Sequence, residues 1–540
     1  MKIFDQQNID LLCSGNHELY KRASIDFEYN TTVPKFKDNY IASNLDFKNL
    51  KTGERKTLAQ RYKKFTTKNQ GIRVLAMGFL FDFHNAARNI VVQDVEDTIK
   101  EDWFQDAIRD RDIDLFLIIG HVAIHSPEFD AIYKAIRGQQ WDVPVQFFGG
   151  HTHIRDYAKY DNKAYALESG RYLETVGFMS IGGLHQGGKR PRTLSSRLAS
   201  MFSPAVSSRA VAKGPTFSRR YIDNNLFSYF HHTGLNASTF PTPHGLNVSS
   251  QIRSAREKLK LDHSYGCAPQ TFWTNRAPFP SDSSIFTLLK DRVFPDVVSQ
   301  DDRAKVPRIV LTNTGAIRFD IFGGNFTTDT MYAVSPFTSG FRFIKDVPWK
   351  KAKLILNILN QNVPQLWPGD WTIEMQAIAP VSAEVLSSSG SAKSEILKLQ
   401  GAGFDRAQQP LTQHASHVAD PDLTPGYTTH DAAGSDGDDT LHSRIKFYSV
   451  PNCIQAEIAF PKSDLLSSEG SADSPFNVQA NSPETVDVVY NDFLQKYILL
   501  SLQFLGTDYN ETTTDEYMAG KSMTGFLGEW VKENWRCSEG

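Results

Sequence analysis

One pattern occurs three times in the first third of the chain: an apolar run, then glycine, then asparagine or histidine. The copies read IDLLCSGNH, DLFLIIGH and VPVQFFGGHTH, at residues 9–17, 114–121 and 143–153. Amphipathic helical patterns at 95–111 and 126–138 lie between such runs. Alternation of short apolar strands with helices predicts an α/β sheet for this part of the chain.

The residues after the three apolar runs are candidate metal ligands. In an open α/β sheet, ligands bind beyond the carboxyl ends of the strands, and glycine there lets the backbone turn sharply. The three ends would bring together Asn16, His17, His121, His151 and His153. A single copy is equally compatible with a turn that exposes its histidines, but three in order favour a metal site. Imidazole and amide donors suit zinc, manganese, iron or nickel better than calcium.

The length of 540 residues predicts two domains, which we place at 1–240 and 241–540. Residues 186–215 are basic and rich in serine, and we expect a mobile insertion there. Residues 386–440 are polar, and we expect them to be partly disordered. In the second domain, the apolar pattern predicts a strand near 308–315, and helices at 249–261, 283–294, 349–361 and 483–506.

Composition limits the partners and the compartment. A formal charge of −3 leaves no basic excess for nucleic acid, and the longest apolar runs are too short for a membrane span. Residues 5–10 are mostly polar, so we expect no export signal in the chain as written. The pattern of cysteines, which lack a CxxC pair, is compatible with two disulfides or four buried thiols: Cys13, Cys267, Cys453 and Cys537.

Longer motifs carry a resemblance to a known family. GNHELY, GH and GGHTH resemble the later motifs of the calcineurin-like metallophosphoesterase superfamily. NTGAIRFDIFGGNFTTDTMYAVSPF at 313–337 resembles the C-terminal domain of 5'-nucleotidases, and YTTHDAAGSDGDD at 427–439 is similar to a Gly-Gly-Asp-Gly-aromatic loop of that domain. FGGHTHIRDY, SRRYIDNN and LTPGY look closest to an uncharacterised fungal branch. The resemblance covers nearly the whole chain apart from the two polar insertions.

The resemblance implies a fold and a metal site. The fold would be an αββα metallophosphoesterase sandwich followed by an α/β 5'-nucleotidase-type C-terminal domain. Asn16, His121 and His151 match the ligands of the second metal of the family, and His153 matches a ligand of the first. His17 matches the histidine that hydrogen-bonds the phosphate or protonates the leaving oxygen.

The resemblance also implies substrate contacts in the second domain. Asn313 and Arg318 match residues that contact the substrate, and Arg276 matches a phosphate-binding arginine. Phe337 matches an aromatic residue that stacks on the base, and Asp436 matches a ribose contact. The alternatives are that Arg318 pairs with a surface acid and that Phe337 is a core residue.

The chain departs from the family pattern ahead of GNHE. The family has Asp-x-His and Gly-Asp motifs there, so the resemblance implies that the first βαβ part of the sandwich is missing. Two dications about 4 Å apart repel by roughly 15–20 kcal/mol at an effective dielectric of 20, and the missing aspartates would offset that repulsion. We therefore expect at most one well-formed metal site. Asp82-Phe83-His84 spells Asp-x-His, but no Gly-Asp motif follows, and we interpret it as a coincidence.

Two further departures concern the substrate. Tyr20 stands where nucleotidases commonly carry an aspartate that orients the catalytic histidine, and Asp438 replaces the second base-stacking aromatic residue. Loss of one stacking face costs about 1–3 kcal/mol of base affinity.

These observations give one leading hypothesis and two alternatives. The leading one is a metal-dependent, 5'-nucleotidase-like phosphoester hydrolase of nucleotide catabolism, using zinc, manganese or iron, whose activity is impaired in this chain. The first alternative is a non-catalytic protein that binds a nucleotide or phosphate, and the second is a gene model started at an internal methionine. The expected partner is a small phosphorylated substrate, with a vacuolar or secreted location if the complete gene encodes a signal peptide and a cytoplasmic one otherwise. The oligomeric state is open.

Overall fold

The computed structural model describes residues 2–184, 215–360, 448–460 and 482–537, with two short strands at 430–431 and 434–435. The chain forms two compact units, the first running to Gly245 and the second beginning at Leu246. The insertions predicted at 186–215 and 386–440 lie outside the described residues, apart from Pro215 and the four strand residues.

A six-stranded sheet forms the centre of the first unit. Its four inner strands are parallel, and the two edge strands run antiparallel to their neighbours. In spatial order the strands are β3 (Tyr62–Thr66), β4 (Arg73–Leu80), β6 (Leu115–His121), β7 (Val145–Phe148), β9 (Ala164–Ser169) and β8 (Arg155–Asp161). Inner parallel strands are covered on both faces, which explains why β4 is apolar after Arg73 and buried at the seven positions that follow it.

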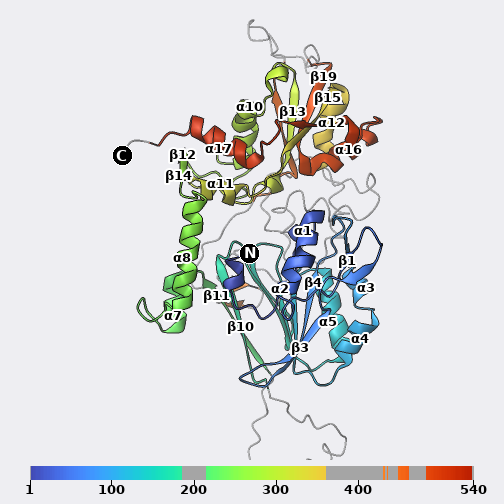
Figure 1. The fold of residues 1–540 in the computed structure, drawn as a ribbon, viewed down its shortest axis with the longest axis vertical. Coiled ribbons are helices and arrows are strands. Elements are labelled where there is room, and N and C mark those ends of the chain that lie inside the picture. The colour runs from blue at the N-terminus through green and yellow to red at the C-terminus, as the bar shows by residue number, and fades with distance from the viewer. Residues whose placement is uncertain are drawn as a thin grey trace, which may run out of the picture. The chain divides into compact units, whose positions relative to one another are not determined.

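Helices and a small sheet cover the six-stranded sheet. One face packs through Leu75, Met77 and Phe79 in a core with helices α3 (Val95–Thr98), α4 (Asp102–Arg109) and α5 (Pro127–Gln139), which Figure 1 shows side by side. Leu80 belongs to a second core, which includes residues of α1 (Arg22–Phe27) and of the sheet β2 (Arg55–Thr57), β1 (Leu45–Lys48) and β5 (Ile90–Val92). The mixed α/β organisation predicted from the sequence is confirmed.

The rest of the first unit consists of short elements and a hairpin. Strands β10 (Thr175–Gly182) and β11 (Thr216–Asp223) pair antiparallel along eight residues each. Tyr221 of β11 packs against Tyr157 and Leu167 of the main sheet. The remaining helices are α2 (Val33–Lys35) and α7 (Leu226–Thr233), and α8 (Pro243–Lys258) crosses the boundary between the units.

Two expectations for the first unit are wrong in detail. The apolar run before GNHE forms no strand; Leu12 alone makes a bridge, to Tyr40, because Leu11, Leu12 and Cys13 are only partly buried. The single helix expected at 95–111 is two helices, because the chain leaves α3 at Ile99 and Glu101 takes an extended conformation ahead of α4.

The second unit contains a five-stranded mixed sheet with a core on each face. Its order is β18 (Cys453–Ile458), β13 (Arg308–Asn313), β19 (Thr485–Asn491), β15 (Phe341–Pro348) and β20 (Asp515–Tyr517). Along β13, Val310 belongs to one core while Ile309 and Leu311 belong to the other, as the alternation of a strand requires. Figure 1 shows α12 (Trp349–Asn360) and α16 (Gln495–Phe504) on one side, with α10 (Phe294–Val297) and α17 (Met523–Asn534) on the other.

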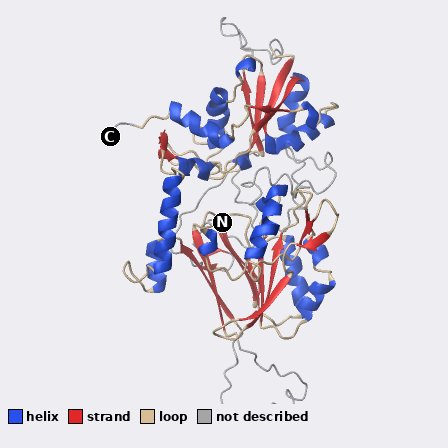
Figure 2. Cartoon of the chain, viewed as in Figure 1, coloured by secondary structure: helices blue, strands red, loops and turns tan. Residues whose placement is uncertain are grey.

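The helix expected at 483–506 is wrong in its first half. TVDVVYN forms β19, a strand buried along nearly its whole length, and α16 starts only at Gln495. Its β-branched residues suit a strand covered on both faces. The other elements of this unit are α9 (Ile285–Leu288) and α11 (Thr328–Val334), and the pair β12 (Ser264–Ala268) and β14 (Gly324–Thr327). Strands β16 (His430–Asp431) and β17 (Gly434–Ser435) pair with each other, and Figure 2 shows how helices and strands are distributed.

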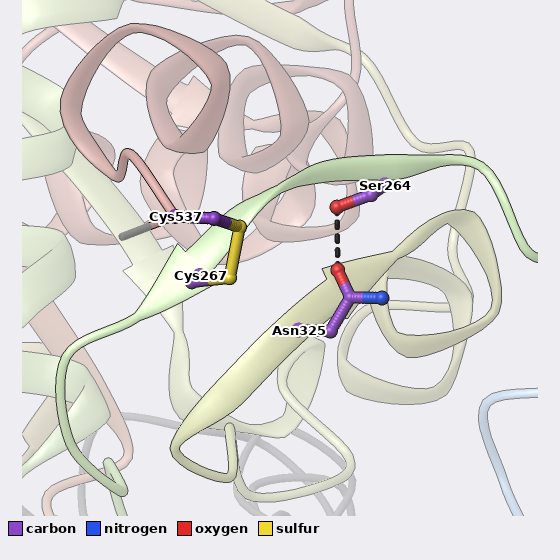
Figure 3. The surroundings of a disulfide bond; sticks show 4 residues. All are labelled: Ser264, Cys267, Asn325 and Cys537. Atoms are coloured by element: carbon purple, nitrogen blue, oxygen red, sulfur yellow. Dashed lines mark hydrogen bonds between the residues drawn. A yellow bond between two sulfur atoms is a disulfide. The ribbon is translucent and has the colours of Figure 1, made fainter. Parts of the chain in front are cut away.

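One disulfide and two thiols account for the cysteines. Cys267 in β12 is bonded to Cys537, which follows α17, and on the same strand Ser264 donates a hydrogen bond to Asn325 (Figure 3). Cys13 and Cys453 are free thiols. The structure therefore matches neither two disulfides nor four thiols.

Candidate functional site

The ends of two parallel strands and one turn carry the predicted metal ligands. His121 is the last residue of β6, and His151 follows Gly149 and Gly150 after β7. Asn16, which is 3% exposed, begins a short 3-10 turn, Asn16–Glu18. The register of β6 with its neighbours sets these ends side by side, because Leu80 pairs with His121 and Ile119 pairs with Phe148.

Three donor atoms converge at this edge. The Oδ1 atom of Asn16 lies 3.0 Å from Nε2 of His121, and that nitrogen lies 3.1 Å from Nδ1 of His151. With metal–donor bonds of about 2.1 Å, neighbouring donors of an octahedral or tetrahedral ion lie about 3.0–3.4 Å apart. These two distances match the spacing of neighbouring ligands on one transition-metal ion, and they also match ordinary hydrogen bonds.

The protonation state of His121 is compatible with metal binding. Burial is the main cause that lowers the pKa of His121 to about 3, with smaller contributions from the nearby His153 and His17. The imidazole is therefore neutral near pH 7, and a metal would have no proton to displace from it. The Cys13 thiol has a pKa raised to about 12, chiefly by burial, so it is protonated and a poor ligand.

The loop that carries the two histidines has a strained backbone. His151 has a φ of 80° and His153 a φ of 64°, in the left-handed region that residues other than glycine seldom adopt. Such conformations persist where surrounding structure enforces them, often at functional sites.

Neighbouring side chains orient the three donors. Nδ2 of Asn16 donates to the Tyr20 hydroxyl across 3.0 Å, which leaves Oδ1 facing His121. The ring of Phe81 lies with its centroid 4.4 Å from that of His151. His17 is exposed, with its ring 5.3 Å from the ring of Tyr20.

The predicted substrate residues of the second unit lie on loops beside its sheet. Asn313 is the last residue of β13 and is 5% exposed. The guanidinium carbon of Arg318 lies 5.0 Å over the ring of Phe337, a distance typical of a cation–π contact. The structure therefore brings Arg318 and Phe337 together.

Arg276 lies on a neighbouring loop that is tied to the Arg318 loop. Its guanidinium lies 5.4 Å over the ring of Trp273. Oδ1 of Asp320 accepts hydrogen bonds from the backbone N–H of Thr274, at 2.7 Å, and from its hydroxyl, at 2.8 Å. Thr274 and Asp320 are two residues from the two arginines. Asp436, the predicted ribose contact, lies outside the described residues.

Sequence reasoning missed Phe81 and Asp320, and it identified Tyr20 only as a departure from the family pattern. Phe81 contacts His151 and Asp320 joins two loops, but neither stands in a recognisable metal motif. Within the described ranges, no group of three or more His, Cys, Asp and Glu side chains could hold a metal ion. Asn16, His121 and His151 include only two such side chains.

Two family profiles match the chain. That of the calcineurin-like phosphoesterases matches residues 2–155, and that of the NAD nucleotidase C-terminal domain matches residues 271–499. No described helix is both long and apolar enough to cross a bilayer.

Individual proteins match over nearly the full chain. An uncharacterized protein from Schizosaccharomyces pombe is 32% identical, with 99% of this chain and 79% of that protein covered. A secreted protein from Arthroderma benhamiae is also 32% identical, with the same coverage. The crystal structure of 5'-nucleotidase from Candida albicans is 32% identical, with a TM-score of 0.71, and the match covers 99% of this chain and 84% of that one.

Proposed function

Because this chain belongs to the calcineurin-like phosphoesterases that carry a 5'-nucleotidase-type C-terminal domain, we propose that it hydrolyses a phosphate ester of a nucleotide. The observation that carries the proposal is the convergence of Asn16 Oδ1, His121 Nε2 and His151 Nδ1 within 3.0–3.1 Å steps. A three-donor edge of this kind, in a hydrolase family that uses divalent metals, supports a metal-dependent phosphoesterase.

Asn16, His121 and His151 would hold the metal, with His153 beside them. Zinc, manganese or iron are the ions that these donors favour. Such an ion, when bound, supplies a water of lowered pKa and neutralises charge on the phosphate. The lowered pKa of His121 keeps one donor nitrogen unprotonated at neutral pH.

The other proposed roles belong to side chains of the chain itself. His17, exposed beside the ligands, would donate a proton to the leaving oxygen of the ester. Arg318 would bind the phosphate or the sugar as a charged donor, and Phe337, against which it lies, would offer a ring to the base. Arg276 and Asn313 would complete the contacts.

The neutral donor set favours a second candidate function. Asn16, His121 and His151 carry no negative charge at neutral pH, so they balance none of the charge of a dication. We therefore expect slow turnover, and the second candidate is a protein that binds nucleotides without hydrolysing them.

Metal binding, nucleotide binding and phosphate release, measured on one preparation, separate these functions. The full chain is stripped of metal and titrated with Mn²⁺ or Zn²⁺, and then incubated with AMP. Binding of metal with phosphate release supports the hydrolase. Thermal stabilisation by AMP without phosphate release supports the binding protein. If His121→Ala loses neither metal binding nor phosphate release, the proposed metal site is excluded.

Two variants refine the experiment. His17→Ala should keep metal affinity and lower turnover at least tenfold, because a general acid contributes 10²–10⁴-fold. His84→Ala is the matched control, since His84 is exposed and lies near Asp94 outside the ligand cluster. A loss of metal affinity in His84→Ala would instead assign the metal to the Asp82-Phe83-His84 segment.

The compartment follows from the cysteines. We propose that the chain passes through the secretory route, to the outside or to a vacuole, because a disulfide forms and persists in oxidising compartments and a similar protein is described as secreted. Thiol counting on protein from the native host tests this: two reactive thiols after denaturation fit the disulfide, and four contradict it.

A further inference from the structure

A buried carboxylate lies directly behind the histidine loop. Glu168, in β9, is 2% exposed, and both of its oxygens accept hydrogen bonds. Oε1 accepts from the backbone N–H of Ile124 at 2.8 Å, and Oε2 accepts from the hydroxyl of Thr152. Ile124 follows His121 by three residues, and Thr152 stands between His151 and His153, so one side chain joins the two ligand-bearing segments.

The packing around this carboxylate is tight. A Cβ on Gly149 would lie 2.5 Å from the Ile124 side chain, 2.7 Å from the carbonyl oxygen of Val122 and 3.2 Å from Cγ of Glu168. Gly150 N–H also donates to the carbonyl of Val122, at 3.0 Å. The segments after β6 and β7 are therefore in direct contact, and Glu168 lies at their junction.

The burial of Glu168 beside another acidic side chain destabilises the folded state unless other contacts offset it. It is paired across β8 and β9 with Asp156, which is 6% exposed, so two acidic side chains share one buried face. Like charges directly opposite in a sheet are destabilising, and buried carboxylates are costly unless hydrogen-bonded. Asp156 is balanced by His125, whose Nε2 lies 3.1 Å from its Oδ2. The hydrogen bonds from Ile124 and Thr152 offset the cost of burying the Glu168 carboxylate.

We propose that Glu168 is a positioning residue of the ligand site. Its carboxylate holds Thr152 against the segment that follows His121 and so enforces the left-handed backbone of His151 and His153. We call this contact, in which Glu168 joins Thr152 to the segment after His121, the clamp. The clamp is supported by the hydrogen bonds and burial of Glu168, whereas its effect on metal binding rests on the proposed function.

Hydrogen exchange on the metal-free full chain tests the clamp. Thr152→Val removes the hydroxyl at constant shape, and Glu168→Gln leaves a single neutral acceptor, so Ile124 N–H and the Thr152 hydroxyl can no longer both donate to an anionic carboxylate. Both should raise amide exchange at least tenfold in peptides covering 149–153 and leave β3 and β4 unchanged. Thr152→Ser, which keeps the hydroxyl, should behave as wild type, as should Glu54→Gln, an exposed residue with the same charge change.

The outcomes separate the clamp from general stability. Unchanged exchange at 149–153 in both Thr152→Val and Glu168→Gln overturns the proposal. A rise spread through the whole first unit also overturns it, because it shows loss of overall stability.

Titration with Co²⁺, followed by the visible absorbance of the bound ion, tests the consequence. Thr152→Val and Glu168→Gln should bind Co²⁺ 10- to 100-fold more weakly, the range for residues that orient metal ligands. Equal affinity in wild type and variants overturns the positioning role. Absence of Co²⁺ binding in wild type, together with the expected exchange pattern, leaves the clamp supported and refutes the metal-dependent function.

Discussion

The amide of Asn16 is fixed at both ends. Its Nδ2 donates to the Tyr20 hydroxyl across 3.0 Å, and its Oδ1 lies 3.0 Å from Nε2 of His121. An amide has one donor end and one acceptor end, so with Nδ2 bonded to the Tyr20 hydroxyl the oxygen faces His121. Tyr20, which stands where the family commonly carries an aspartate, thus contacts a proposed ligand, whereas the resemblance implies that the aspartate orients the catalytic histidine.

Tyr20→Phe should weaken metal binding. Without the hydroxyl, the amide of Asn16 loses the partner that fixes its orientation, and the turned form would present N–H groups to the ion. We expect about tenfold lower Co²⁺ affinity, the lower end of the range for residues that orient ligands, with little change in melting temperature. Tyr29→Phe is the control, since Tyr29 stacks on Phe47 in the same unit. Equal affinities for the two variants would contradict the role of Tyr20.

Asn16→Asp should strengthen metal binding. The substitution keeps the shape and replaces a neutral oxygen with an anionic one, which attracts a dication more strongly. We expect at least tenfold higher Mn²⁺ affinity by calorimetry, and Asn16→Ala should lower it. If Asn16→Asp binds no better than wild type, the Oδ1 atom of Asn16 is not a metal ligand.

The stability of the protein should depend on Asp82. Burial, together with the nearby Glu128, Asp94 and Glu96, raises the pKa of Asp82 to about 7 although it accepts a hydrogen bond from Val95. The unfolded chain releases this proton near pH 4, so the folded state binds more protons between pH 4 and 7. Stability from this group is therefore lost as pH rises through that window.

Asp82→Asn tests this pH dependence. The amide oxygen can still accept from Val95, so the variant should melt at a higher temperature than wild type at pH 8 and close to it at pH 4. Asp106→Asn, at an exposed position with the same charge change, should follow the wild-type profile. Parallel melting curves of wild type and Asp82→Asn across pH 4–8 would refute the assignment.

The disulfide should stabilise the second unit. Cys267 and Cys537 are 270 residues apart, and the loss of a native disulfide typically costs about 2–5 kcal/mol. Cys267→Ala with Cys537→Ala should lower the denaturant midpoint of this unit. Cys453→Ala, which removes a thiol alone, controls for the loss of sulfur.

The parts of the fold that the sequence predicts best are the buried parallel strands. RVLAMGFL, LFLIIGH and VQFF became β4, β6 and β7 as expected, because a strand covered on both faces is apolar at most of its positions. TVDVVYN was misjudged because a short apolar run fits a buried strand and a helix equally well, and its two strand partners, β13 and β15, are remote in sequence. The match to 5'-nucleotidases confirms the predicted family and fold class.

The residues of the candidate site also divide into those that the sequence predicts and those that only the fold reveals. Asn16, His121 and His151 are recognisable because each follows an apolar run that ends in glycine. Glu168 is not, because an acidic residue within AYALES looks like the solvent face of a strand, and only the fold shows what covers it. The φ values of His151 and His153 are likewise a product of packing.

The separation of the bonded cysteines determines when the second unit can be completed during synthesis. Cys267 leaves the ribosome long before Cys537, and Cys453 appears between them. Among the cysteines of the second unit, only Cys453 could pair with Cys267 before Cys537 emerges. Burial of Cys453 in β18, next to β13, removes that competitor, and its raised pKa keeps it as an unreactive thiol. The central sheet thus protects the correct pairing before the last helix arrives.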